Sequence, residues 1–181
     1  MHKIPSLTIL SAAVLLSACA AMPTPPAFSQ DALPDAVKVP AGHRVALETV
    51  GVGEITYECR AKSGDAAAFE WVFVGPRADL NGRAGQKLGS YYGPPATWAS
   101  DDGSRITGTQ VAIAPARAGS IPLQLVKANP AVGSGAMSGV SFVQRVATQG
   151  GVAPTLACDA ASTGRREVVK YQADYIFWKP A

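Results

Sequence analysis

Runs in which apolar and polar side chains strictly alternate most constrain what this chain can fold into. In residues 54–61, Tyr57 and Cys59 lie on an apolar face, while Glu58 and Arg60 lie on the opposite face. Residues 166–178 repeat this pattern over a longer stretch. The apolar positions of the second run are Val169, Tyr171, Ala173, Tyr175 and Phe177. A period of two residues is typical of a β-strand with one buried face.

Further short apolar runs fill the rest of the chain and are separated by turn-forming residues. We expect strands at 44–50, 54–61, 69–74, 86–92, 97–99, 105–114, 121–127, 140–147 and 166–178. Asn81-Gly82 and 101–104 predict turns, and 76–80 suggests one helical turn. Because of Pro122, the run at 121–127 is expected at a sheet edge or as a strand beginning at that proline. The prediction is one all-β domain, an antiparallel sandwich or barrel.

The N-terminus reads as a bacterial lipoprotein signal peptide, residues 1–18. Lys3 precedes a short apolar stretch, and the string Leu16-Ser17-Ala18-Cys19 resembles a lipobox. Cleavage before Cys19 and acylation of that cysteine would anchor the protein to a membrane. By resemblance to proteobacterial lipoproteins, Ala20 in place of Asp implies an outer-membrane lipoprotein of the cell envelope, with its domain in the periplasm or on the cell surface. An ordinary signal peptide cleaved near residues 20–22 is the alternative.

Residues 19–42 are expected to link the lipid to the folded domain. Five prolines lie among small and polar residues there, which favours an extended, semi-rigid tether. The domain itself is predicted to span residues 43–181. Its start coincides with the first of the expected strands.

The cysteine count predicts one disulfide. If Cys19 carries lipid, Cys59 and Cys158 remain as an even pair in an oxidising compartment. A reactive thiol or a metal pair is the alternative, which lacks a nearby histidine or a CxxC spacing. We therefore expect Cys59 and Cys158 to be bonded to each other.

The sequence offers little catalytic chemistry. His43 is the only histidine after residue 18, and the usual hydrolase, nucleotide and dinucleotide motifs are missing. The formal charge is +3 without a basic run, which argues against nucleic-acid binding. We accordingly predict no catalytic residue, no metal site and no cofactor.

Candidate ligand-binding residues are few. Tyr91, Tyr92 and Trp98 flank the Gly93-Pro94-Pro95 break, and Asp101 and Asp102 follow on a turn. Aromatic and acidic side chains on loops can bind sugars or other flat ligands. Alternatively, Trp98 fills the core and the aspartates only form the turn.

Arg145 is a further candidate, because it would place a charge near the core, in the expected strand between Gln144 and Val146. It suits an anion or carboxylate clamp. An ion pair with Asp174 or Glu58 is the alternative, and the sequence does not decide between them.

Several strings resemble a family catalogued as domain of unknown function 3455, of secreted bacterial and fungal proteins. They include Gly53-x-x-x-Tyr57-x-Cys59, Gly93-Pro94 through Trp98, and Gln144-Arg145-Val146-x-Thr148-x-Gly150-Gly151-x-Ala153-Pro154. The likeness covers roughly residues 50 to 178. It departs where relatives usually carry histidine, here Tyr91, and where Leu123 follows Ile121-Pro122. The resemblance implies no established activity.

Two functions remain open at this stage. The first is a lipid-anchored envelope domain that binds a small ligand, a glycan or an envelope protein. The second is an envelope hydrolase or carbohydrate-active protein using loop acids and aromatics around Trp98.

Overall fold

Eight antiparallel strands form one sheet that closes into a barrel in the computed structural model, which describes residues 27–181. Each strand pairs with the next, and the last returns to the first. The strands are β1 (His43–Lys62), β2 (Asp65–Asn81), β3 (Lys87–Tyr92), β4 (Thr97–Ser100), β5 (Arg105–Ala114), β6 (Leu123–Ala128), β7 (Phe142–Gly150) and β8 (Arg166–Pro180). Two short 3-10 helices are η1 (Asp35–Val37) and η2 (Ala160–Ser162). The expectation of an all-β domain is confirmed, in its barrel form.

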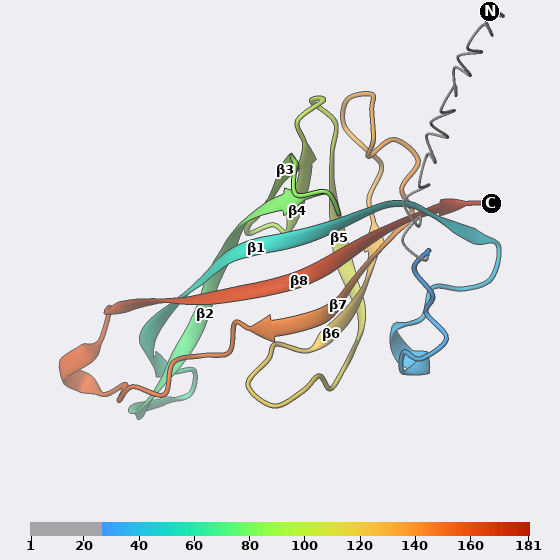
Figure 1. Ribbon diagram of the computed structural model, residues 1–181. Coiled ribbons are helices and arrows are strands. Elements are labelled where there is room, and N and C mark those ends of the chain that lie inside the picture. The colour runs from blue at the N-terminus through green and yellow to red at the C-terminus, as the bar shows by residue number, and fades with distance from the viewer. Residues whose placement is uncertain (1–26) are drawn as a thin grey trace, which may run out of the picture.

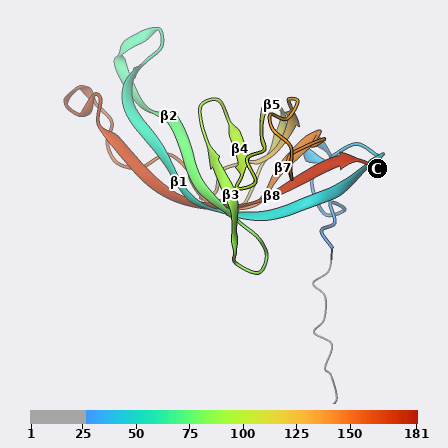
Figure 2. The ribbon, with the colours of Figure 1, turned by 90° about the horizontal axis from the view of Figure 1, so that it is seen from above.

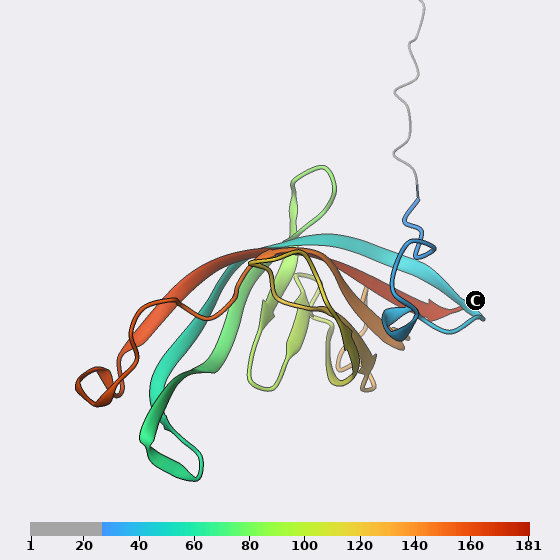
Figure 3. The ribbon, with the colours of Figure 1, turned by 90° about the horizontal axis from the view of Figure 1, so that it is seen from below.

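Three strands, β1, β2 and β8, are much longer than the others. Figure 1 shows β1 and β8 running side by side across the molecule, and they pair from His43 to Glu58. In Figures 2 and 3 the long strands bend, with the shorter strands on their concave side. Register shifts in β1 after Val45 and after Thr56 mark β-bulges, which bend strands and increase their twist.

Two details of the expected strands are wrong, and a third is decided between its two alternatives. The runs 44–50 and 54–61 form one strand, because Gly51 and Gly53 mark close approaches rather than a break. A Cβ on Gly51 would lie 2.5 Å from the Tyr175 ring. The helical turn expected at 76–80 is part of β2, where Leu80 points into the core. For the run 121–127 the structure favours the strand that begins beside the proline: β6 starts at Leu123 and is paired on both sides, so it is not a sheet edge.

Apolar and aromatic side chains fill the barrel interior. The main buried cluster contains Ile55, Tyr57, Ala78, Leu80, Tyr91, Trp98, Ile106, Ile121, Val126, Met137, Val140, Val143, Tyr171, Ala173, Tyr175 and Phe177. The alternation read in residues 166–178 places Tyr171, Ala173, Tyr175 and Phe177 inside, as expected. The predicted turn at 101–104 joins β4 to β5.

The outer face of the barrel carries a second core under residues 28–39. Val37 and Val39, which are 0% and 3% exposed, pack with Ile176 and Trp178 of β8. Phe28 meets the Trp178 ring edge-on at 6.2 Å. The prediction of an extended tether up to residue 42 is therefore wrong for residues 28–39, which belong to the folded body. The predicted signal peptide, Cys19 and the start of the linker lie outside the described residues.

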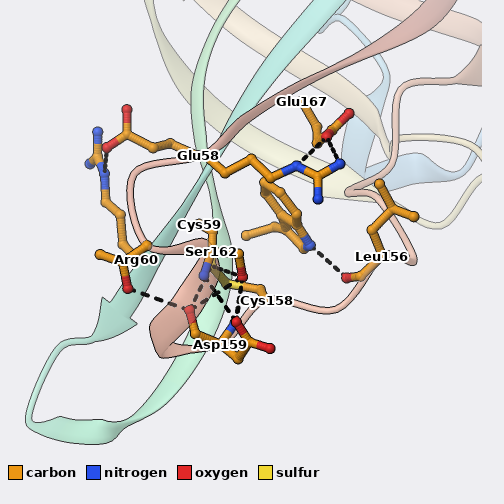
Figure 4. The surroundings of a disulfide bond; sticks show 11 residues. Glu58, Cys59, Arg60, Leu156, Cys158, Asp159, Ser162 and Glu167 are labelled. Carbon is orange, nitrogen blue, oxygen red and sulfur yellow. Dashed lines mark hydrogen bonds and ion pairs between the residues drawn. A yellow bond between two sulfur atoms is a disulfide. The ribbon is translucent and has the colours of Figure 1, made fainter.

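Cys59 and Cys158 form the expected disulfide, with Cα atoms 5.5 Å apart. Figure 4 shows that the bridge joins β1 to the segment leading into β8. Beside it, the indole Nε1–H of Trp71 donates to the carbonyl of Leu156 at 2.9 Å. Asp159 and Ser162 cap η2 through reciprocal side-chain bonds to each other's backbone N–H. The bridge therefore holds the segment that follows β7 against the far end of β1.

Candidate ligand-binding cavity

An open cavity of about 390 Å³ lies inside one end of the barrel. Its walls come from two groups of strands, β2 to β4 with the turn between β3 and β4 on one side, and β5 to β7 on the other. Its lining residues are Phe73, Pro76, Tyr91, Gly93, Pro94, Ala96, Trp98, Gly108, Gln110, Gln124, Val126 and Arg145. The volume lies within the range of small-molecule sites in proteins.

One wall of the cavity is aromatic and prolyl. Tyr91 and Trp98 face each other across the β3–β4 ladder, so both point into the barrel. Their rings stack with centroids 4.8 Å apart, and Tyr91 also packs on Tyr175 at 5.0 Å. Trp98 is 1% exposed, and its Nε1–H has no acceptor among residues 27–181. The aromatic pair is thus both core and cavity wall.

The opposite wall is polar. Arg145 of β7 pairs in register with Gln124 of β6, and Gln124 donates to the amide oxygen of Gln110 at 2.6 Å. The Arg145 guanidinium donates through Nε and Nη2 to the carbonyl oxygen of Pro122, at 3.2 and 3.0 Å. The side-chain amides of Gln110 and Gln124 and the guanidinium of Arg145 therefore face the aromatic wall.

Arg145 does not form the ion pair considered for it. Asp174 pairs with Arg83 at 2.8 Å, and Glu58 pairs with Arg60 and Arg166. Within residues 27–181, no carboxylate oxygen lies within 4.0 Å of the Arg145 nitrogens. The cation is positioned by a neutral carbonyl instead.

Four tyrosines belong to the buried cluster inside the barrel, namely Tyr57, Tyr91, Tyr171 and Tyr175, and Tyr91 lines the cavity together with Arg145. Burial raises the pKa of each phenol, whereas the nearby Arg145 charge acts in the opposite direction. Tyr57 donates to the carbonyl of Gly151 at 2.7 Å, and the hydroxyls of Tyr171 and Tyr175 lie 3.2 Å apart. The phenols therefore stay neutral at neutral pH, and they leave the arginine charge uncompensated.

Residues 40–179 match the family model described as protein of unknown function (DUF3455). The chain belongs to the DUF3455 family. No curated protein and no solved structure matches it. The resemblance noted in the sequence is thereby confirmed. The family description assigns no activity.

The most specific string of this DUF3455 chain, residues 144–154, contributes side chains to both faces of β7. Gln144 is buried on the outer face, and Arg145 points to the cavity. A bulge follows, with Ala147 in the left-handed region at φ 49°, and the Thr148 hydroxyl donates to the Ile121 carbonyl at 2.6 Å. The string therefore supports the cavity, because Ile121 adjoins the Pro122 carbonyl that holds Arg145.

The structure brings together only part of the predicted binding set. Tyr91, Trp98 and Arg145 share the cavity, whereas Tyr92 is 43% exposed on the outer face. Asp101 and Asp102 occupy the turn after β4, at the end opposite the cavity-lining turn at 93–96. Neither aspartate is among the residues that line the cavity.

Asp102 has a structural role in the turn of this DUF3455 domain. Its carboxylate accepts hydrogen bonds from the Ser104 hydroxyl and backbone N–H, and from the N–H of Ala136 at 2.7 Å. The Ser104 hydroxyl foremost, then these N–H groups, lower the pKa of Asp102 well below its ordinary value. The carboxylate ties the β4–β5 turn to the loop before β7.

Gln110, Gln124 and Phe73 were missed as cavity residues. Gln124 stands between Leu123 and Leu125, and Leu125 faces the outer core. The polar residue therefore faces inward, against the usual pattern. A glutamine in an apolar strand was the available signal, and it resembles the signal that drew attention to Arg145.

Proposed function

We propose that this DUF3455 protein is a lipid-anchored protein of the bacterial cell envelope whose barrel binds a small ligand in the cavity beside Arg145. One observation carries the binding role: a cavity of ligand size has an aromatic wall facing a wall of hydrogen-bonding groups. A few polar groups in an otherwise apolar pocket fix the orientation of a ligand. The envelope hydrolase is not proposed, because no carboxylate or imidazole is among the described cavity-lining residues.

The envelope location rests on two supports. The first is the string Leu16-Ser17-Ala18-Cys19 with its preceding apolar stretch. The second is the Cys59–Cys158 disulfide, a bond that persists in oxidising compartments. Within residues 27–181, no helix has the length and apolarity needed to cross a bilayer. We place the protein at the outer membrane, with its membrane contact made through lipid on Cys19.

A thermal-shift screen of the full-length protein against a chemically diverse small-molecule library tests the binding role. Ala96 lines the cavity, so Ala96→Trp fills it, and Ala96→Ser is the matched control. We expect some compounds to raise the melting temperature of the wild type and of Ala96→Ser but not of Ala96→Trp. A library without stabilising compounds, or hits that bind Ala96→Trp equally, would contradict the proposal.

Labelling cells with radioactive palmitate tests the anchor. The wild type should incorporate label and sediment with the outer membrane, whereas Cys19→Ser should do neither. Ser63→Ala is the control, because it changes an exposed residue of the folded domain and leaves all three cysteines in place. Label that persists in Cys19→Ser would exclude the lipoprotein assignment.

A further inference from the structure

One cationic side chain of the cavity has no carboxylate partner among the described residues. Arg145 is the only charged residue among the described lining residues, and no carboxylate of residues 27–181 lies within 4.0 Å of it. A guanidinium has five N–H donors in a planar fork. Two of its nitrogens, Nε and Nη2, donate to the Pro122 carbonyl, so both N–H groups of Nη1 and one of Nη2 have no acceptor among residues 27–181.

The neighbouring phenols cannot supply the missing negative charge. Tyr57, Tyr91, Tyr171 and Tyr175 are buried, and burial raises the pKa of each. A guanidinium forms stronger, charge-assisted hydrogen bonds with an anionic oxygen than with a neutral acceptor. The natural complement of a planar fork is a planar carboxylate, which accepts two parallel hydrogen bonds.

The rest of the cavity suits a flat body attached to that anion. Tyr91 and Trp98 present stacked rings, and Phe73 and Pro94 extend the same wall. Ring faces favour offset stacking with other flat, unsaturated groups. Across the cavity, the Gln110–Gln124 pair retains one amide donor group and one acceptor oxygen.

Resting on the proposed function, we infer that the ligand is a flat aromatic or conjugated carboxylate, with its carboxylate on Arg145 and its ring beside Tyr91 and Trp98. A neutral sugar would leave the Arg145 charge unpaired. A phosphate or phosphonate can also accept two hydrogen bonds from the fork, but its tetrahedral group carries up to two negative charges against one cation and does not continue the plane of a ring. The inference therefore names the ligand class for the cavity.

Calorimetry on the full-length protein in detergent tests this with 2-naphthoate, its neutral isostere 2-naphthamide, and cyclohexanecarboxylate. We expect 2-naphthoate to bind best, and naphthylphosphonate to bind more weakly. Arg145→Gln should weaken 2-naphthoate by about tenfold or more while leaving 2-naphthamide unchanged. Arg145→Lys keeps the charge but not the fork, and should give an intermediate loss. Arg77→Gln is the matched control, because Arg77 is exposed and is not among the cavity-lining residues.

Each result bears on one of the two proposals. Equal binding of the acid and the amide, or full 2-naphthoate affinity in Arg145→Gln, overturns the inference and leaves the cavity a binding site for another class. A preference for the phosphonate or for cyclohexanecarboxylate overturns it as well. If 2-naphthoate does not bind, the inference fails, and the proposed function then stands only on library compounds that Ala96→Trp excludes. Circular dichroism of each variant establishes that a lost affinity is not lost folding.

Discussion

The indole Nε1–H of Trp178 donates a 2.8 Å hydrogen bond to the amide oxygen of Gln144, on the outer face of the barrel. The Gln144 amide in turn donates to the carbonyl of Val37 at 2.7 Å and to the side-chain oxygen of Gln30 at 3.0 Å. Gln144 is 0% exposed. One buried glutamine thus joins β7, β8 and the segment 28–39.

Gln144→Met should destabilise the protein. Methionine has a similar length but cannot pair with Trp178 or Val37, so a buried N–H and a buried carbonyl lose their partner. Leaving such groups unsatisfied costs about 1–3 kcal/mol each, and we expect the free energy of unfolding to fall by about 2–4 kcal/mol. Urea denaturation followed by tryptophan fluorescence measures the change.

Gln149→Met is the control for this variant, because Gln149 lies on the same strand and is exposed. It should change the free energy of unfolding by less than about 0.5 kcal/mol. Equal stabilities of Gln144→Met and wild type would show that the network contributes nothing to holding residues 28–39.

Removing the disulfide should lower stability more than any single surface change. The bridge joins residues 99 apart in sequence, so it restricts the unfolded chain strongly. Loss of a native disulfide typically costs about 2–5 kcal/mol. We expect the double variant Cys59→Ala, Cys158→Ala to unfold at lower urea concentration than the wild type.

Dithiothreitol provides the internal control for the disulfide prediction. It should shift the wild type towards the double variant and leave the double variant unchanged. Unfolding of both proteins at the same urea concentration, with or without dithiothreitol, would contradict the prediction.

The turn at Asp102 should give a pH-dependent contribution to stability. Hydrogen bonds from Ser104 and Ala136 lower the pKa of the folded carboxyl. A group with a depressed folded pKa stabilises the protein above its unfolded value of about 3.9 and loses that effect as the pH falls below it. Asp102→Asn should therefore lower the melting temperature at neutral pH, and its difference from wild type should shrink on acidification through about pH 4.

Asp101→Asn is the matched control, because it removes the same charge from the adjacent, exposed position. Melting curves by circular dichroism should show little change for this variant at any pH. A constant difference between Asp102→Asn and wild type from pH 7 down through about pH 3 would contradict the role given to the ionised carboxylate.

The alternation that defines β8 was readable because a period of two residues belongs to a strand alone. Ile176 and Trp178 are apolar residues at positions where the alternation would place polar ones. They are apolar because residues 28–39 cover them on the outer face of the barrel. Prolines made this segment resemble a linker. Its apolar residues Val37 and Val39 indicated that the segment packs against the domain. No local sequence pattern predicts the surface against which they pack.

The cavity was predictable in part for a similar reason. Tyr91, Trp98 and Arg145 stand out by residue type, whereas Gln110 depends on register. A bulge between Gln110 and Ala112 exchanges the faces of β5, so Gln110 points to the cavity while Ala114 joins the outer core. An extra residue of this kind reverses inward and outward positions, and sequence periodicity does not locate it.

Gly151→Ala should be among the more destabilising single changes in the barrel. Gly151 has φ 81°, and a Cβ there would lie 2.9 Å from the Tyr171 Cβ and 3.1 Å from Ile55. The left-handed backbone costs an L-residue about 1–2 kcal/mol, and forced overpacking adds about 1–3 kcal/mol. Gly164 also has φ 81° but open space at its Cβ, so Gly164→Ala should pay only the backbone cost. Urea denaturation should therefore rank wild type above Gly164→Ala and Gly164→Ala above Gly151→Ala; equal losses in the two variants would show that Tyr171 and Ile55 yield to the added methyl group.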